Sequence, residues 1–366
     1  MRKNIGIIGV RGLEVVYSGF ETFVRNLIDR SDRSKFYYFL FSRAGYQKKK
    51  SNGENFKDIV VSTLSNKYLE TPIYGFFSTI YSIFLPLDAV LYLSVANTPF
   101  LWLQRFRKRK IIVNVDGLDW KRARWPLFGK IYLKLCEYFT VKFSDIIVCD
   151  SKSVLSYYKK RYGFNNIINI AYGAEVKKRK AGTTLTKFNL EKNKYFLFVG
   201  RLTPENKVDE FISAFKGIKT NFKCVVMGDS FFENSYKRKL IRISKSDKRI
   251  VFTGILKGKS YEEIGSNAFA YIETKSVGGI HPSLLEAMAF GNCIIARNLS
   301  EHREALANTG LYYGGRRPVV DLRKKMFLLL KDSKEVHRLG ILAKKRAGEK
   351  FKWQEVVGKY EDIFNG

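Results

Sequence analysis

The sequence is poor in residues that stabilise a chain covalently. Only four cysteines occur among 366 residues, and none belongs to a CxxC pair or has a histidine partner at a metal-binding spacing. This pattern argues against a disulfide framework and against a structural zinc motif. We expect four buried free thiols in a reducing compartment. They are Cys136, Cys149, Cys224 and Cys293.

Long apolar runs are also missing. A membrane-spanning helix needs roughly eighteen or more apolar residues without charges, and every such stretch here contains a charge or a breaker. The nearest approach, residues 73–93, is interrupted by Pro86 and Asp88, which indicates a helix, a turn and a buried strand. The apolar run at residues 4–10 is too short for a signal peptide and is typical of a first strand.

Acidic residues are scarce relative to basic ones: 34 against 66, which gives a net charge of +32. Such a field attracts nucleic acid, an anionic membrane surface or phosphorylated substrates, although a lysine-rich composition without a partner is the alternative. The basic residues do not belong to any recognised nucleic-acid-binding motif, so we expect no nucleic-acid partner. The basic clusters lie at residues 48–50, 105–110, 121–124 and 177–180.

What the sequence does contain is an alternation of apolar strand-length runs with amphipathic helical stretches. Continuous apolarity is typical of parallel strands buried on both faces, so we expect two doubly wound, Rossmann-like α/β domains. The predicted strands are residues 4–10, 36–42, 58–64, 88–94, 110–115, 145–150, 194–200, 223–229, 249–254, 268–274, 292–298 and 311–314.

Polar, charged residues between the two halves predict an interdomain linker at 176–193. The expected division is a first domain at 1–175 and a second domain at 194–345; the motifs described below predict that the first binds an acceptor and the second a nucleotide sugar. A C-terminal helix at 346–366 is expected to pack back toward the first domain.

One segment, "SVGGIHPSLLEAMAFGN" at residues 276–292, combines two glycines with an apolar helix that starts near Pro282. In doubly wound sheets ligands bind at the carboxyl ends of the strands, where free N–H groups of a helix start can hold a phosphate. The lone acid Glu286 is then a partner for ribose hydroxyls, because a buried carboxylate without partners is costly. The alternative is an exposed acid on an ordinary helix. The donor-binding residues predicted here are Gly278, Gly279, His281, Pro282, Ser283, Leu284 and Glu286.

Two cations follow the predicted strand at 194–200, which is the first strand of the second domain. Arg201 and Lys207 stand at a strand-to-helix loop, where they suit a diphosphate leaving group. Basic residues are common, so this signal gains weight only together with the glycine–proline segment. His281 and His302 flank the same region, but a histidine near a loop is more often structural.

Two segments of the first half are further candidates. In "NVDGLDWKRARW" at residues 114–125, Asp116 is predicted to orient or deprotonate an acceptor; with no third ligand nearby, we expect no metal. In residues 9–28 the glycines do not form the dinucleotide fingerprint. Glu21 either closes a capping box with Ser18 or lines the acceptor site. The acceptor or cleft residues predicted here are Arg11, Gly12, Gly19, Glu21, Asp119 and Trp120.

These motifs resemble those of known glycosyltransferases. The stretch "HPSLLEAMAFGN" is similar to the donor-site helix of the retaining glycosyltransferase family 4, which has the GT-B fold of two Rossmann-like domains facing across a cleft. The stretches "RGLEVVYSGFETFVRNL", "NVDGLDWKRARW", "IIVCDS" and "AYGAE" resemble the DUF1972 subgroup of bacterial rhamnosyltransferases.

The resemblance implies transfer of L-rhamnose from dTDP-L-rhamnose to a lipid-pyrophosphate-linked sugar in capsule or cell-wall polysaccharide synthesis, without a metal or other cofactor. A UDP- or GDP-hexose donor, or an epimerase or phosphorylase of the same fold, is the alternative. The family carries two glutamates eight positions apart; the second matches Glu286, but the first position is Gly278, as suits a deoxy sugar with fewer hydroxyls.

A lipid-linked acceptor implies a cytoplasmic protein peripheral on the inner face of the membrane. The first half is expected to meet anionic headgroups with a basic and aromatic face. Its members are Tyr68, Phe76, Phe77, Trp102, residues 105–110 and Trp125.

Overall fold

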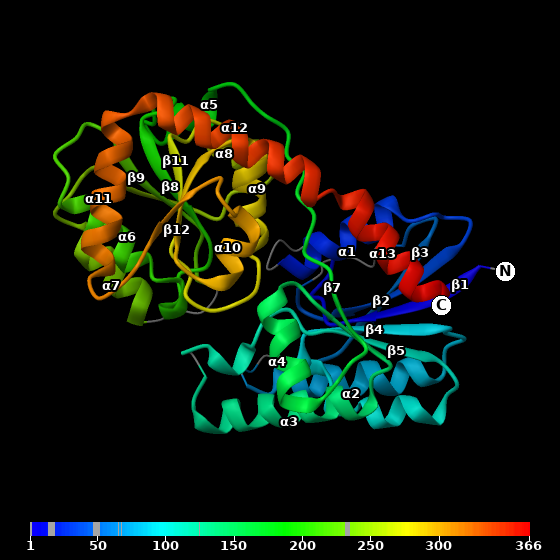
Figure 1. The fold of residues 1–366 in the computed structure, drawn as a ribbon. Helices are drawn as coiled ribbons and strands as arrows, with labels where there is room; N and C mark the ends of the chain where they lie inside the picture. The colour runs from blue at the N-terminus through cyan, green and yellow to red at the C-terminus, as the bar shows by residue number, and fades with distance from the viewer. Residues whose placement is uncertain are drawn as a thin grey trace. The chain divides into compact units, whose positions relative to one another are not determined.

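The computed structural model describes residues 2–13, 19–46, 52–64, 66, 68–123, 125–230 and 235–366. The chain divides into two compact units (Figure 1). Unit 1 consists of Met1–Gly173 together with Trp353–Gly366, and unit 2 of Ala174–Lys352.

Unit 1 is built on a parallel seven-stranded sheet with strand order β3-β2-β1-β4-β5-β6-β7. The order reverses between β1 and β4, which is the topological switch point of a Rossmann-like sheet. Its central strands are apolar along their whole length because helices cover both faces; all five residues of β4, for example, are buried. The strands are β1 (Lys3–Ile8), β2 (Phe36–Arg43), β3 (Phe56–Val61), β4 (Ala89–Leu93), β5 (Lys110–Asn114), β6 (Ile146–Cys149) and β7 (Ile167–Asn169).

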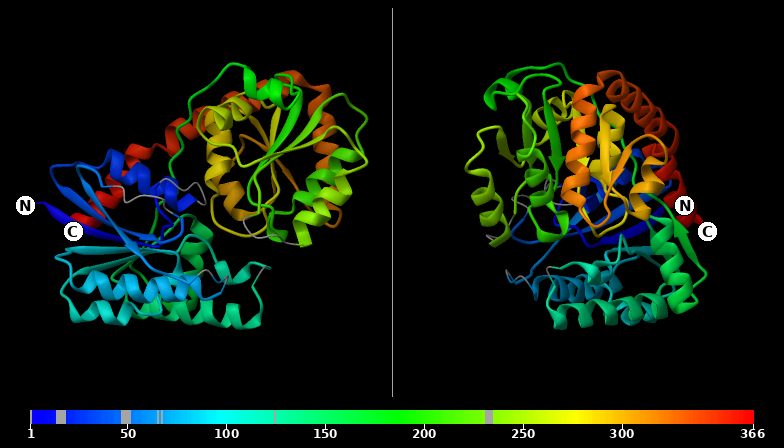
Figure 2. Two further views of the ribbon diagram at one scale, coloured as in Figure 1. Left: turned by 180° about the vertical axis from the view of Figure 1, so that it is seen from behind. Right: turned by 60° about the vertical axis from the view of Figure 1, so that its left-hand side comes forward.

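The helices of unit 1 lie on both sides of this sheet, with α2, α3 and α4 on one side and α1 and α13 on the other (Figures 1 and 2). They and three short 3-10 helices are α1 (Gly19–Arg30), α2 (Glu70–Ile83), η1 (Val95–Asn97), η2 (Leu101–Phe106), η3 (Asp119–Lys121), α3 (Leu127–Phe143), α4 (Lys152–Tyr162) and α13 (Trp353–Asn365).

Helix α13 belongs to unit 1 although it follows unit 2 in the sequence. Tyr360 packs on Phe23 of α1 with ring centroids 4.8 Å apart, and its hydroxyl accepts a hydrogen bond from the Asn114 amide at 2.7 Å. Two lysines bind the last carbonyls of the helix: Lys3 Nζ donates to Phe364 O at 3.0 Å and Lys110 Nζ to Ile363 O at 2.8 Å. Cations at this end complement the helix dipole.

Unit 2 contains a parallel six-stranded sheet with strand order β10-β9-β8-β11-β12-β13, which reverses between β8 and β11. It therefore repeats the doubly wound architecture of unit 1.

The two sheets contain all twelve strands predicted from the apolar runs. The three-residue edge strand β7 was not predicted, because three residues give no periodic signal. The strands of unit 2 are β8 (Tyr195–Val199), β9 (Lys223–Met227), β10 (Ile250–Gly254), β11 (Ala270–Glu273), β12 (Cys293–Arg297) and β13 (Leu311–Tyr313).

In unit 2, helices α6, α7 and α11 lie on one side of the sheet and α8 and α9 on the other (Figure 1). Helix and 3-10 bounds are α5 (Thr183–Lys187), η4 (Pro204–Asn206), α6 (Val208–Lys216), α7 (Ser235–Ser244), α8 (Gly258–Ser266), α9 (Pro282–Phe290), α10 (Ser300–Leu306), α11 (Pro318–Lys331) and α12 (Ser333–Lys350).

Two boundaries differ from the expected division. Residues 176–193, expected as a linker, are part of unit 2: the buried carboxylate of Glu263 in α8 accepts the backbone N–H groups of Gly182 at 2.9 Å and Leu185 at 2.8 Å. The return to unit 1 comes at Trp353, and α12 before it stays in unit 2.

All four cysteines are buried and free, as their spacing predicts. Among the described residues, no helix is both long enough and apolar enough to span a bilayer.

Candidate functional site

The donor-site residues predicted from the sequence gather at one edge of the unit 2 sheet. Arg201 follows β8, and the segment from Gly278 to Ser283 follows β11. Strands β8 and β11 are neighbours at the point where the strand order reverses. This edge is where doubly wound sheets bind ligands.

Hydrogen bonds join the loop after β8 to the loop after β11. Thr274 Oγ1 donates to Asn206 O at 2.6 Å, and Ser276 donates to Glu205 O both from its backbone N–H at 2.9 Å and from its hydroxyl at 2.8 Å. The Asn206 amide in turn donates to Arg201 O at 2.7 Å. The two segments predicted to bind phosphate are thus held together within one unit.

The start of α9 has the geometry that the glycine–proline segment predicts. Pro282 is the first helical residue, where its missing N–H costs nothing. Gly278 has φ +133°, a conformation that a side chain rarely adopts. A Cβ at Gly278 would lie 2.6 Å from His281 Nε2, so the imidazole fills the space beside this glycine. Leu284 has no exposed surface, and its side chain therefore faces the core rather than a ligand.

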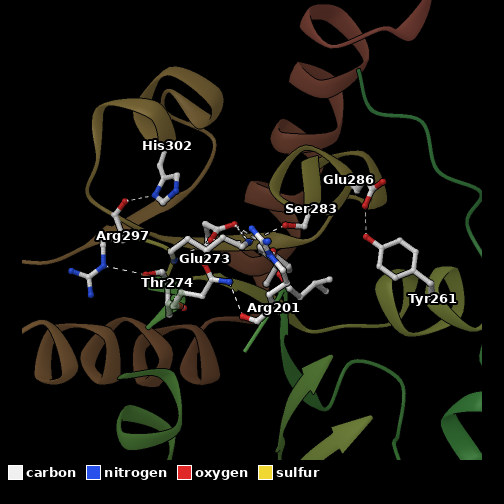
Figure 3. Close-up of polar contacts among 12 residues, drawn as sticks. Arg201, Tyr261, Glu273, Thr274, Ser283, Glu286, Arg297 and His302 are labelled. Atoms are coloured by element: carbon white, nitrogen blue, oxygen red, sulfur yellow. Dashed lines mark hydrogen bonds and ion pairs between the residues drawn. The ribbon is translucent and has the colours of Figure 1, made fainter. Parts of the chain in front are cut away.

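A buried cation lies behind the start of α9. Lys275 Nζ lies 3.1 Å from Glu273 Oε1 and 2.9 Å from Glu273 Oε2, and the two residues form an ion pair. The same ammonium donates a hydrogen bond to Ser283 Oγ at 2.9 Å. Gly200 provides room for this chain, since a Cβ there would lie 3.0 Å from Lys275 Cε. With the Ser283 oxygen accepting from Lys275, its hydroxyl proton is left to donate to another group. Figure 3 shows Ser283, Glu273 and Arg201 converging on one region.

Glu286 lies one turn further along α9 and accepts a hydrogen bond from the Tyr261 hydroxyl of α8 (Figure 3). The residue is half-buried, and the desolvation raises the pKa of its carboxyl above the ordinary range, while Tyr261 and Lys275 oppose the shift. It is therefore neither the exposed acid of an ordinary amphipathic helix nor a core residue. One carboxylate oxygen binds the phenol, and the other can accept from a hydroxyl-bearing ligand.

The second predicted cation, Lys207, occupies a strained position between η4 and α6. Its φ is +50°, in the left-handed region that non-glycine residues seldom adopt. Its ammonium has no side-chain partner in the described part of the chain, whereas the buried Lys275 is fully paired. Strain of this kind is found at functional positions.

A histidine pair borders the same edge. His302 is fully buried, and its Nδ1 lies 2.7 Å from Arg297 O. Burial lowers the pKa of this imidazole, so it is neutral and donates from Nδ1. His281 and His302 have ring centroids 5.8 Å apart.

With Glu273, the two histidines form a group whose ligand atoms lie within 4.8 Å of one another. This donor set has the composition of a divalent-metal site. However, the Lys275 ammonium already contacts both Glu273 oxygens at 2.9 and 3.1 Å, so the carboxylate already has a cationic partner. The residues fit an internal ion pair better than they fit a metal.

In unit 1, the predicted acid Asp116 follows β5 and has φ +54°. Its carboxylate accepts from the Tyr172 hydroxyl at 3.1 Å and lies 3.8 Å from the Arg122 guanidinium, which binds Asp119 at 2.5 Å. Burial and the neighbouring Asp119 carboxylate raise the pKa of Asp116. A raised pKa makes Asp116 a better proton acceptor than an ordinary aspartate.

The other unit 1 candidates lie at the ends of β1 and β5. The buried Glu21 of α1 accepts the backbone N–H of Arg11 at 3.2 Å, so it anchors the loop that carries Gly12 (φ +139°). Gly19 begins α1; Ser18, the other member of the predicted capping box, lies outside the described residues. Trp120 stacks under Lys134, whose Nζ is 3.6 Å from the ring centroid.

The predicted basic and aromatic face needs a correction. Two members of the cation run 105–110 have structural roles: Arg109 donates to Ser82 O at 2.8 Å, and Lys110 binds the end of α13. Trp125 is half-buried and packs against the unit 1 core. Within residues 105–110, all of which the structure describes, Arg105 pairs with Asp145, and the exposed cations that form no ion pair are Arg107 and Lys108.

The sequence analysis did not predict the buried Glu273–Lys275 ion pair or the hydrogen bond from the Tyr261 hydroxyl to Glu286. Glu273 ends the apolar strand β11 and Lys275 stands two residues later, so both point to one face of extended backbone. That spacing could have indicated the pair. Tyr261 comes from another helix, 25 residues before Glu286, and no local pattern marks it.

Comparisons with known proteins agree with this fold. Residues 184–346 match the model of the family described as Glycosyl transferases group 1, and residues 88–175 match DUF1972, a domain of unknown function. The chain therefore carries a glycosyltransferase group 1 domain preceded by a DUF1972 domain. No curated protein matches the sequence.

Solved structures share the whole fold at low sequence identity. The sucrose-phosphate synthase from Thermosynechococcus elongatus is 15% identical with a TM-score of 0.85, covering 100% of this chain and 98% of that one. HepE from Anabaena, in complex with UDP-glucose, is 12% identical with a TM-score of 0.81 and 99% coverage of both chains. A glycosyltransferase from Rickettsia africae is 15% identical with a TM-score of 0.72, covering 99% and 98%. The architecture is that of the GT-B glycosyltransferases.

Proposed function

We propose that the protein is a retaining glycosyltransferase that moves L-rhamnose from dTDP-L-rhamnose to a lipid-pyrophosphate-linked sugar in bacterial capsule or cell-wall polysaccharide synthesis. One observation carries the proposal: the half-buried Glu286, the cations Arg201 and Lys207, and the start of α9 gather at the switch point of one sheet. The family match over residues 184–346 supports the reaction class.

The donor nucleotide is held by charge and by hydrogen bonds. Glu286 accepts from the ribose hydroxyls with the carboxylate oxygen that Tyr261 does not use. Arg201, Lys207 and the Ser283 hydroxyl bind the diphosphate together with the first N–H groups of α9. These groups bind more strongly as charge builds on the leaving phosphate, which is the condition for catalysis.

The reaction needs no metal in this proposal. The acceptor hydroxyl attacks the anomeric carbon from the face that the phosphate leaves, so configuration is retained. Its proton passes to the departing phosphate oxygen, and the C–O bond to the diphosphate breaks as the new glycosidic bond forms. Asp116 in unit 1 orients the acceptor, and its raised pKa suits it to share a proton.

The choice of a deoxy sugar rests on Gly278. A glutamate at this position is disfavoured by φ +133° and would require the His281 imidazole to shift. A donor sugar with one hydroxyl fewer has less need of that carboxylate. We further propose that the protein works in the cytoplasm, peripheral on the inner face of the membrane, where a lipid-linked acceptor is found.

The test is incubation with dTDP-L-rhamnose, UDP-glucose and GDP-mannose, each with a synthetic lipid-pyrophosphate sugar. We expect product only with dTDP-L-rhamnose, and NMR of the new linkage should show retained configuration. Product from a UDP- or GDP-hexose instead would establish the alternative donor. Donor conversion without the lipid acceptor would indicate an epimerase or a phosphorylase and would overturn the proposal.

A further inference from the structure

Large apolar side chains are exposed mainly in one part of unit 1. Of the twenty that are exposed in the described residues, fourteen lie between Leu64 and Tyr138. Soluble surfaces carry such residues singly, whereas a contiguous group marks a contact surface. Thirteen of the fourteen lie on or next to α2, η2 and α3, and we call this group the α2–η2–α3 face. Its members are Tyr68, Leu69, Phe76, Phe77, Tyr81, Phe84, Trp102, Phe106, Leu127, Phe128, Ile131, Leu135 and Tyr138.

Helix α3 is apolar on both of its sides. Its inner side contributes Leu133 and Cys136 to the core. Its outer side exposes Leu127, Phe128 and Ile131 at 75%, 60% and 62%. An ordinary surface helix is polar on the side opposite the core, so the outer side of α3 is built for a medium other than water.

The three elements form one surface. η2 contacts both α2 and α3, and the two helices lie on the same side of the sheet (Figures 1 and 2). Ring contacts continue across the elements: Tyr68 and Phe128 are 5.2 Å apart between centroids, and Phe76 and Phe100 are 5.0 Å apart. Trp and Tyr among the exposed rings are the residues that favour a membrane–water interface.

The exposed charges on α2, η2 and α3 themselves have one sign, although Asp145 just after α3 pairs with Arg105 of η2. The acids of α2 and α3, Glu70 and Glu137, are both buried. η2 has no acid, and Arg107, Lys108 and Lys142 nearby are exposed. A second copy of the chain would bring these cations against one another, whereas an anionic surface complements them.

We infer that the α2–η2–α3 face docks on an anionic lipid bilayer, with the apolar side chains of α3, α2 and η2 inserted at the headgroup–acyl boundary and the cations at the phosphates. Insertion, more than charge, supplies the binding: α3 acts as an interfacial helix that belongs to a folded domain. The inference does not depend on the donor or acceptor proposed above.

The test is flotation with vesicles of phosphatidylcholine and phosphatidylglycerol in roughly equal amounts, with no nucleotide or sugar present. The variant L127S/F128S/I131S should lower the partition coefficient by about tenfold or more, because it removes three buried apolar side chains from the bound state. These side chains are exposed, so circular dichroism should show an unchanged fold.

The matched control is F327S/L328S/I341S in unit 2, where the parent residues are exposed at 45%, 56% and 55%. It should bind vesicles as the parent does. Equal loss in both variants would mean that general hydrophobicity, and not this face, binds lipid; no loss in either, or no binding by the parent, would overturn the inference. A parent that is dimeric in solution and a triple variant that is monomeric would assign the face to a second copy instead.

A second pair of variants separates the two contributions. R107Q/K108Q should reduce binding at low salt and have little effect at high salt, because surface charges are screened there. Binding that vanishes entirely at high salt in the parent would contradict insertion. Failure of the transferase assay with intact vesicle binding would refute the proposed function alone.

Discussion

Lys275 and Glu273 form an ion pair inside unit 2, with Nζ 2.9 Å from Oε2 and side-chain exposures of 6% and 0%. The last residue of β11 and a residue of the loop that follows it thereby neutralise each other directly behind the segment predicted to bind phosphate. The remaining donor capacity of Lys275 goes to Ser283 Oγ at 2.9 Å. The pair fixes the direction of a hydroxyl at the start of α9 and adds no net charge there.

Replacing one member of this ion pair should destabilise the protein more than replacing both members. Lys275→Met leaves a buried carboxylate unpaired and should lower the free energy of unfolding by roughly 3–5 kcal/mol. The double variant K275M/E273Q should recover most of that loss, as measured by urea denaturation. If the double variant is as unstable as the single one, packing of the lysine chain and not its charge is what matters.

Glu286→Gln should weaken donor nucleotide binding by roughly 1.5–3 kcal/mol, since a charge-assisted hydrogen bond is lost. Calorimetry measures the affinity, and Glu355→Gln in α13 of unit 1 is the control. Unchanged affinity would remove Glu286 from the ribose site.

Glu286 should also make the affinity for the donor nucleotide depend on pH. Burial raises the pKa of Glu286 in the folded protein, so the carboxylate forms only above the ordinary glutamate range. Nucleotide affinity in the parent should therefore rise as pH increases through that raised pKa, and Glu286→Gln should flatten the curve. A profile identical in parent and variant would assign the titration elsewhere.

Arg201→Ala and Lys207→Ala should lower kcat by about a hundredfold with a smaller change in donor affinity, because their charges act on the leaving phosphate. Lys207→Gly separates charge from backbone: glycine relieves φ +50° but also removes the ammonium. Equal loss in K207A and K207G identifies charge as the cause, whereas activity retained in K207G would identify the backbone.

Chelation tests the alternative role of the histidine group. EDTA should leave activity nearly intact, and elemental analysis of the purified protein should find less than one bound divalent metal per chain. Activity lost to EDTA and restored by Mg²⁺ or Zn²⁺ would assign a metal either to Glu273, His281 and His302 or to the acids near Asp116.

Gly278→Ala should destabilise unit 2, because a Cβ meets His281 Nε2 at 2.6 Å and φ is +133°. Positions of this kind cost about 1–3 kcal/mol for a non-glycine residue. Gly315→Ala is the control: its φ is +76°, but a Cβ there meets nothing within 4 Å. A smaller loss at Gly278 than at Gly315, measured by thermal unfolding, would contradict the close approach of His281.

The sequence predicts what depends on local pattern. Buried parallel strands are apolar throughout, so twelve strands and the two sheets follow from apolar runs; Pro282 and the glycines mark the start of α9. The pairing of Glu286 with Tyr261 and the paired state of Lys275 do not follow, because they depend on side chains from other elements. The cation run 105–110 misleads for the same reason: nothing local shows that Lys110 binds a helix end some 250 residues later.

Helix α13 has a consequence for synthesis. It follows all of unit 2 in the chain, yet its rings pack on α1 and its last carbonyls bind Lys3 and Lys110. Domains generally fold in the order in which the ribosome makes them. Here unit 2 is one continuous segment, and its last residue is synthesised before unit 1 is complete. Unit 1 keeps an uncovered apolar surface around Phe23 until the ribosome has made Trp353–Asn365. The unit translated first is thus the one completed last.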